Sequence, residues 1–208
     1  TALKEAWFSA VDPLTAAPRE DIQLPTDQQV IGAVQRASGV DTVVMCAAGT
    51  MPGELHTLWK APRPGAYHME YGFSCMGYEI AGAMGIKMAE PDRDVVCMIG
   101  DGSYMMANSE LATAVMRRVP FTGVLTDNRG YGCINRLQQG CGGEPFNNMY
   151  VDCNVEAQPE IDYVAHAAAM GAHAMRAATI ADLETEVAAA RGRDRPTVIV
   201  IETDAGEA

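Results

Sequence analysis

Hydrophobic residues along the chain form two kinds of pattern. Short continuous runs rich in valine and isoleucine predict buried strands, over residues 41–48, 94–100, 121–128 and 196–204, with shorter strands over 66–72 and 172–177. Stretches with apolar residues every three or four positions predict helices, over residues 28–38, 75–91, 108–119, 161–171 and 179–193. Strands that are apolar throughout are typical of a parallel sheet covered on both faces by helices. We therefore expect an α/β fold with a doubly wound parallel sheet.

Three segments lack these patterns. Residues 1–25 are rich in turn and cap residues and predict a linker with one short amphipathic helix, leading from a missing preceding domain. Thr26 or Asp27 is expected to cap the next helix, and residues 26–208 to form one domain. The prolines and glycines that follow Gly49 predict a loop, and the glycine-rich stretch from residue 130 to 159 an irregular segment that is functional or mobile.

Composition narrows the class of protein. The 208 residues carry a formal net charge of −12, which disfavours nonspecific nucleic-acid binding. No apolar run is long enough to span a bilayer, and no secretory signal is recognisable. None of the six cysteines shows a C-x-x-C spacing, which favours buried, reduced thiols over disulfides or a zinc site. We expect a cytoplasmic protein, and the start at Thr1 suggests a piece of a longer chain.

The sequence "IGDGS" places a carboxylate between two glycines where a strand ends. Asp101 is followed 27 residues later by Asn128, which also comes directly after a predicted strand. Carboxylate and amide oxygens suit magnesium or calcium. The amides of Gly102 and Ser103 precede a helix, where they can face a diphosphate. A lone G-D-G is more often a plain turn with a solvated aspartate; the complete pattern of strand, GDGS, helix, strand and Asn favours a metal site.

The stretch "GDGSYMMANSELATAVMRRVPFTGVLTDNRGYG" resembles the thiamin-diphosphate motif of the acetolactate synthase and pyruvate decarboxylase superfamily. This resemblance implies thiamin diphosphate and Mg²⁺ as cofactors. It implies that Asp101, the Asn128 side chain and the Gly130 carbonyl bind the metal, and that Gly100, Gly102, Ser103 and Gly132 contact the cofactor. Asp127 stands where the family usually has a first asparagine, but the metal ligand, the second residue, is intact.

The resemblance extends upstream of this motif. "YGFSCMGYEIAGAMGIKMA" is similar to the family segment that supports the bent cofactor, which implies that Met76 is the apolar wedge and that the Ser74 carbonyl accepts a hydrogen bond from the aminopyrimidine. Without the flanking pattern, Met76 would read as an ordinary core methionine. "CAAGTMPGELHTLW" matches the family loop after the first strand and implies diphosphate contacts at Gly49, Thr50 and Met51.

Within this family the chain is most similar to the trihydroxycyclohexanedione hydrolases of bacterial myo-inositol catabolism, notably in "GYGCINRLQ". That implies hydrolytic C–C cleavage of a polyhydroxylated cyclic dione to 5-deoxyglucuronate, in a homodimer or homotetramer. The family's activating glutamate lies on a separate pyrimidine-binding domain, usually from the partner subunit, so we expect no catalytic residue in this chain. Glu70 and Glu110 are assigned structural roles. We expect the chain alone to be catalytically silent.

Other residues and functions remain open. His56 and His68 flank the cofactor loops and could touch substrate, although structural roles are favoured, while Tyr131 and Cys133 are candidates for the substrate side. Another thiamin-diphosphate enzyme, such as an acetolactate synthase or a 2-keto acid decarboxylase subunit, is the main alternative. A nucleotide-binding Rossmann module lacks its G-x-G-x-x-G after the first strand. A non-catalytic assembly domain is disfavoured by the intact metal motif.

Overall fold

The computed structural model describes residues 2–18 and 24–204 of the chain. Its centre is a six-stranded sheet in the order β2-β1-β3-β4-β6-β5, in which every neighbouring pair is parallel. The strands are β1 (Val43–Cys46), β2 (Tyr67–Met69), β3 (Val95–Gly100), β4 (Thr122–Asp127), β5 (His173–Arg176) and β6 (Thr197–Glu202). The expected doubly wound parallel sheet is confirmed.

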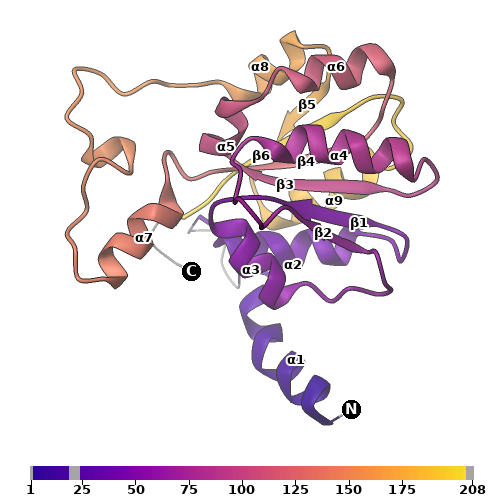
Figure 1. Ribbon diagram of the computed structural model, residues 1–208, viewed down its shortest axis with the longest axis horizontal. Coiled ribbons are helices and arrows are strands. Elements are labelled where there is room, and N and C mark those ends of the chain that lie inside the picture. Colours follow the sequence, from indigo (N-terminus) through magenta and orange to yellow (C-terminus); the bar gives the residue numbers. More distant parts are fainter. Residues whose placement is uncertain (1, 19–23, 205–208) are drawn as a thin grey trace.

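Helices cover both faces of this sheet (Figure 1). One face packs against α2 (Asp27–Ala37), α3 (Thr50–Leu58) and α9 (Ile180–Ala190), with α1 (Ala2–Thr15) outside them. The other face packs against α4 (Tyr78–Ala89), α5 (Asp101–Met106), α6 (Glu110–Arg117) and α8 (Tyr163–Ala169). The remaining helices, α7 (Gly132–Gly140) and the 3-10 turn η1 (Tyr150–Asp152), lie on a segment that projects away from the sheet.

The continuous apolar runs of the strands follow from this sandwich. Along β3, Val96 and Met98 point into the core beneath α2, α3 and α9, whereas Cys97 and Ile99 point into the core beneath α4, α5, α6 and α8. Successive side chains of a strand face opposite sides of a sheet, so both sets are buried only when both faces are covered.

The connections of β1 and β3 determine where a ligand can bind. These two strands are neighbours, but β1 leads into α3 on one face of the sheet and β3 leads into α5 on the other. The chain therefore diverges at the carboxyl ends of β1 and β3, which opens a crevice between the two loops. Ligands of doubly wound sheets bind at such a switch point.

Three expectations from the sequence were wrong in detail. The first part of the loop expected after Gly49 is the helix α3, whereas residues 59–66 form neither helix nor strand, as expected. The proline at position 52 is compatible with α3 because it falls in the first helical turn, where no backbone N–H donor is needed. The segment expected to be irregular from residue 130 to 159 contains α7 and η1. The helix expected over 108–119 is α6 alone, and a separate short helix, α5, begins at Asp101 itself.

The amino-terminal segment predicted as a linker falls partly on residues 1 and 19–23, which lie outside the described residues, as do residues 205–208 of the predicted domain. Its described part forms α1, whose Val11 is buried and whose Thr15 carbonyl accepts a hydrogen bond from Arg36 Nη1 at 2.7 Å. Within the described ranges, no helix is long and apolar enough to cross a membrane.

Candidate cofactor and metal site

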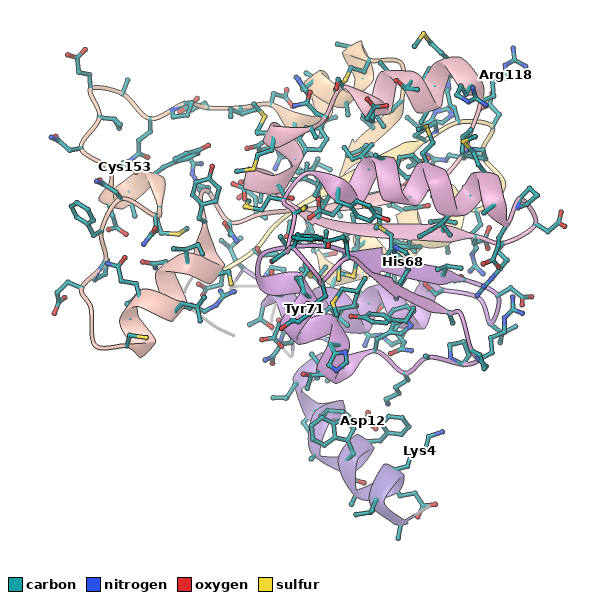
Figure 2. All side chains as sticks on the ribbon, in the orientation of Figure 1. Lys4, Asp12, His68, Tyr71, Arg118 and Cys153 are labelled. Atoms are coloured by element: carbon teal, nitrogen blue, oxygen red, sulfur yellow. The ribbon has the colours of Figure 1, made fainter. Side chains whose placement is uncertain are left out.

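A cavity of about 540 Å³ lies at the carboxyl ends of β1, β3 and β4. It brings together residues that are far apart in the sequence. Nearly all the residues predicted to bind the cofactor or the metal line it, namely Gly49, Met51, Ser74, Met76, Gly100, Asp101, Gly102, Ser103, Asn128, Gly130 and Gly132. Thr50 is the first residue of α3, and its side chain lies outside the described part of the structure. Tyr71, labelled in Figure 2, also lines the cavity.

Asp101 is the first residue of α5 and is only 1% exposed. Its Oδ2 accepts a hydrogen bond of 3.0 Å from the backbone N–H of Gly130. Burial, together with the carboxylate of Asp127, raises the pKa of Asp101 from 3.8 to about 7, against opposing hydrogen bonds from the N–H groups of Gly102 and Gly130. A buried carboxylate whose charge is disfavoured in this way is stabilised in its ionised form by a nearby cation.

Two buried oxygen atoms at the site have no hydrogen-bond partner among the described residues, Asp101 Oδ1 and Asn128 Oδ1. Buried polar atoms are normally satisfied, so two unpaired hard oxygens on neighbouring strand ends fit the ligands of an oxygen-binding cation. Within residues 2–18 and 24–204 no cluster of three His, Cys, Asp or Glu side chains could hold a metal. The candidate set is of another kind, a carboxylate, an amide oxygen and a backbone carbonyl, and such sites are completed by water and phosphate oxygens.

Gly102 and Ser103 lie within the first turn of α5, not before the helix as the sequence suggested. The first four N–H groups of a helix lack intrahelical acceptors, so these amides remain candidates for binding an anion. A Cβ atom at Gly102 would lie 2.6 Å from Tyr131 Cε1. Glycine at this position therefore allows the Tyr131 ring to lie directly against the start of α5.

The segment before α4 carries Ser74 and Met76, and we call residues 74–77 the wedge turn. Ser74 adopts a left-handed φ of 50°, a conformation that favours glycine. The carboxylate of Glu70 holds the approach to this turn, because its Oε1 accepts from the Phe73 N–H (3.0 Å) and its Oε2 from the Cys75 N–H (2.8 Å). These hydrogen bonds lower the pKa of Glu70.

Asp27 lines the same cavity, although sequence reasoning considered it only as a helix cap. Thr26 is the cap, since its side chain accepts from the Gln29 N–H. Asp27 is 2% exposed and lies 3.6 Å from Arg136 of α7. Burial raises its pKa to about 6, while the Arg136 charge opposes the rise. No local signal could have revealed this ion pair, because its partners are more than a hundred positions apart.

Glu79 is a second residue that sequence reasoning missed. It is 1% exposed on α4, and its carboxylate contacts Ser103, a residue of the candidate site. Burial raises the pKa of Glu79, and the hydrogen bond from Ser103 opposes the rise. A charged residue within the otherwise apolar and glycine-rich run "YEIAGAMG" was the available signal.

The remaining candidates divide into two groups. Tyr131 and Cys133 line the cavity. His56 and His68 are not among its lining residues: His56 lies on α3 with its ring 6.2 Å from that of Tyr67, and His68 lies on β2 with Nε2 3.1 Å from the Tyr78 hydroxyl (Figure 2).

Glu110, the first residue of α6, also lies outside the cavity lining. All six cysteines are free. The expectation that they are buried holds only for Cys46 and Cys97, because Cys75 and Cys141 are exposed and Cys133 and Cys153 are partly exposed. Figure 2 shows Cys153 on the segment that projects from the sheet.

Known proteins are similar to this chain in sequence and in fold. The chain is 40% identical over 182 residues to 3D-(3,5/4)-trihydroxycyclohexane-1,2-dione hydrolase 2 of Bacillus cereus, covering 85% of this chain and 28% of the relative. It is 42% identical over 161 residues to the 3D-(3,5/4)-trihydroxycyclohexane-1,2-dione hydrolase of Halalkalibacterium halodurans, covering 77% of this chain and 25% of the relative. The chain thus spans about a quarter of the length of these relatives.

A solved structure shows the same fold at lower sequence similarity. Benzoylformate decarboxylase from Polynucleobacter necessarius superposes with a TM-score of 0.76 at 19% identity, over 92% of this chain and 35% of that chain. The family model for the thiamine pyrophosphate enzyme C-terminal TPP binding domain matches residues 47–201, which include both Asp101 and Asn128. The chain therefore belongs to the thiamine pyrophosphate enzymes and carries their C-terminal TPP-binding domain.

Proposed function

We propose that this chain is the cofactor-binding domain of a thiamin-diphosphate- and Mg²⁺-dependent hydrolase that cleaves a C–C bond of a cyclic 1,2-dione. The substrate class is a trihydroxycyclohexanedione and the product 5-deoxyglucuronate, in inositol catabolism. The observation that carries the proposal is the pair of unpartnered buried oxygens, Asp101 Oδ1 and Asn128 Oδ1, inside a matched TPP-binding domain. The relatives at about 40% identity support the choice of substrate.

Different residues of the cavity would bind the metal and the diphosphate. Asp101, Asn128 and the Gly130 carbonyl would hold Mg²⁺, and the N–H groups of Gly102 and Ser103 would orient the diphosphate. When bound, thiamin diphosphate supplies the carbanion stabilisation that C–C cleavage beside a carbonyl requires.

The neighbouring loops would hold the rest of the cofactor. The diphosphate would lie against Gly49, Thr50, Met51 and Gly132. Gly100, which has no side chain, would allow the backbone to pass close to the diphosphate. The Ser74 carbonyl would accept a hydrogen bond from the aminopyrimidine. Met76 would pack against the bent cofactor and exclude water from one side of it.

The activating glutamate would come from a pyrimidine-binding domain that precedes this one in the intact protein, and a homodimer or homotetramer would bring the two together. We therefore expect this chain alone to be catalytically silent. The main alternative is another thiamin-diphosphate enzyme, such as an acetolactate synthase or a 2-keto acid decarboxylase. The likeness to benzoylformate decarboxylase supports the fold and not that activity, because the identity is 19%.

Calorimetric titration tests the cofactor site. Thiamin diphosphate is titrated, with and without Mg²⁺, into the chain and into the intact protein. We expect Mg²⁺-dependent binding that Asp101→Ala abolishes and that a matched control, Asp92→Ala at an exposed position, preserves. Equal binding by both variants would contradict the assignment of Asp101.

Turnover by the intact protein tests the substrate. We expect acid formation from the cyclic trihydroxydione and no carbon dioxide from pyruvate. Decarboxylation of pyruvate without dione hydrolysis would favour the alternative enzymes. Turnover of the dione by the 208-residue chain alone would contradict the need for a second domain.

A further inference from the structure

Glu79 is an unusual residue for the interior of a domain. It is 1% exposed, and in the described part of the chain no Lys, Arg or His lies within ion-pair distance of it. A buried carboxylate without a counter-ion is costly unless hydrogen bonds satisfy it. Its place as the second residue of α4, near the positive end of the helix dipole, offsets part of that cost.

The hydrogen bonds of Glu79 join two parts of the candidate site. Ser103 Oγ donates to Glu79 Oε1 at 2.7 Å. The backbone N–H of Gly77 lies 2.9 Å from Glu79 Oε2 and 2.8 Å from Ser103 Oγ, so both oxygens can accept from it. All three groups are buried, and bonds to a charged acceptor in such surroundings are stronger than neutral ones.

These bonds act where the wedge turn meets α5. Gly77 has a left-handed φ of 90°, and a Cβ atom there would lie 2.9 Å from Ala107 Cβ, so the turn lies tightly against the end of α5. Ser74 at the other end of the turn is also left-handed, with φ of 50°. A turn with two such residues is held by its surroundings rather than by its own conformational preference.

We propose that Glu79 is a positioning residue, which fixes the wedge turn to the first turn of α5. Ser74 and Met76 on one side, and Gly102 and Ser103 on the other, then keep the spacing that one bound cofactor requires. This inference rests on the proposed function, because it assigns Glu79 to the same cavity. Glu79 itself is not among the residues that line the cavity, so its role is indirect.

Glu79→Gln is the informative variant. Glutamine has nearly the same shape but presents one oxygen and one NH₂ group, so it cannot accept from both Ser103 Oγ and the Gly77 N–H. Glu110→Gln is the matched control, since Glu110 also lies in the first turn of a helix and outside the cavity. Ser103→Ala provides a second variant, because it removes the hydroxyl while the Gly77 N–H keeps Glu79 Oε2.

Two measurements on the intact protein test the proposal: the dissociation constant of thiamin diphosphate with Mg²⁺, by calorimetry, and the hydrogen–deuterium exchange of residues 74–77. For Glu79→Gln we expect cooperative unfolding, affinity weakened by about tenfold and faster exchange in the wedge turn, with Glu110→Gln like the wild type. Unchanged affinity and exchange in Glu79→Gln would overturn the proposal. Should that variant fail to fold, unchanged affinity and exchange in Ser103→Ala would overturn it instead. A wild-type protein that binds no thiamin diphosphate refutes the proposed function, and this inference with it.

Discussion

Replacing Asp101 with asparagine should stabilise the metal-free protein while removing its function. The carboxyl is 1% exposed, and burial, with the Asp127 charge, raises its pKa from 3.8 to about 7. Between these two pKa values, the native state therefore binds more protons than the unfolded state. Stability falls as the pH rises through that window, and the wild type carries the full penalty above about pH 7.

The size of the effect follows from the shift. A rise from 3.8 to about 7 corresponds to roughly 4 kcal/mol of destabilisation at pH 8. Asparagine at position 101 carries no charge and can still accept from the Gly130 N–H. The asparagine NH₂ group would take the place of Oδ1, which has no hydrogen-bond partner. Burying this NH₂ group without an acceptor costs about 1–3 kcal/mol. We expect a net gain of about 1–3 kcal/mol at pH 8, shrinking by roughly 2–3 kcal/mol at pH 5.

Urea unfolding with a metal chelator, at pH 5, 6, 7 and 8, measures this difference directly. Repeating the series with Mg²⁺ and thiamin diphosphate should reverse the order of stability, because only the wild type gains from the ligands. A difference between Asp101→Asn and the wild type that does not change with pH would refute the reasoning. So would a variant that is the less stable of the two at pH 8 without metal.

Three further changes test the packing around the cavity. Gly102→Ala places a Cβ atom 2.6 Å from the ring of Tyr131, which is 42% exposed and can move, so the change should cost about 1 kcal/mol of stability or less. Tyr131→Ala in the same chain should remove this cost, and a cost that persists in the double variant would contradict the contact. Arg136→Met leaves the buried Asp27 without its ion-pair partner and should lower the free energy of unfolding by about 3 kcal/mol at pH 8. The decrease should be smaller at pH 5, where Asp27 is mostly protonated. Unfolding measured across this pH range tests the prediction, and an equal decrease at both pH values would argue against it. Thr26→Ala removes the capping box of α2 and should lower the free energy of unfolding by about 1 kcal/mol, with no change in cofactor affinity.

Much of the architecture was predictable from the chain alone. The strands are valine and isoleucine runs that only a sheet covered on both faces can bury, and they alternate with helical patterns, so the parallel α/β fold followed. The spacing of Asp101 and Asn128 after two such strands placed both oxygens at one sheet edge, and the structure brings them into one cavity. Local patterns sufficed for the edge, because parallel strands end at the same edge of a sheet, whereas the pairing of β3 with β4 was seen only in the structure.

Other features depended on contacts that no local pattern contains. The helices α3 and α7 have glycines or a proline at their starts, which read as loops until tertiary packing and helix-end geometry are considered. Asp27 lines the cavity, and Glu79 contacts one of its residues, only because α2 and α4 begin at the same sheet edge as α5 and α7. The sequence by itself determined the parallel sheet, through the burial of its strands, and its resemblance to a known family indicated the cofactor motif. Only the tertiary structure decided which buried carboxylates support that motif, because their partners are joined by packing and not by the chain.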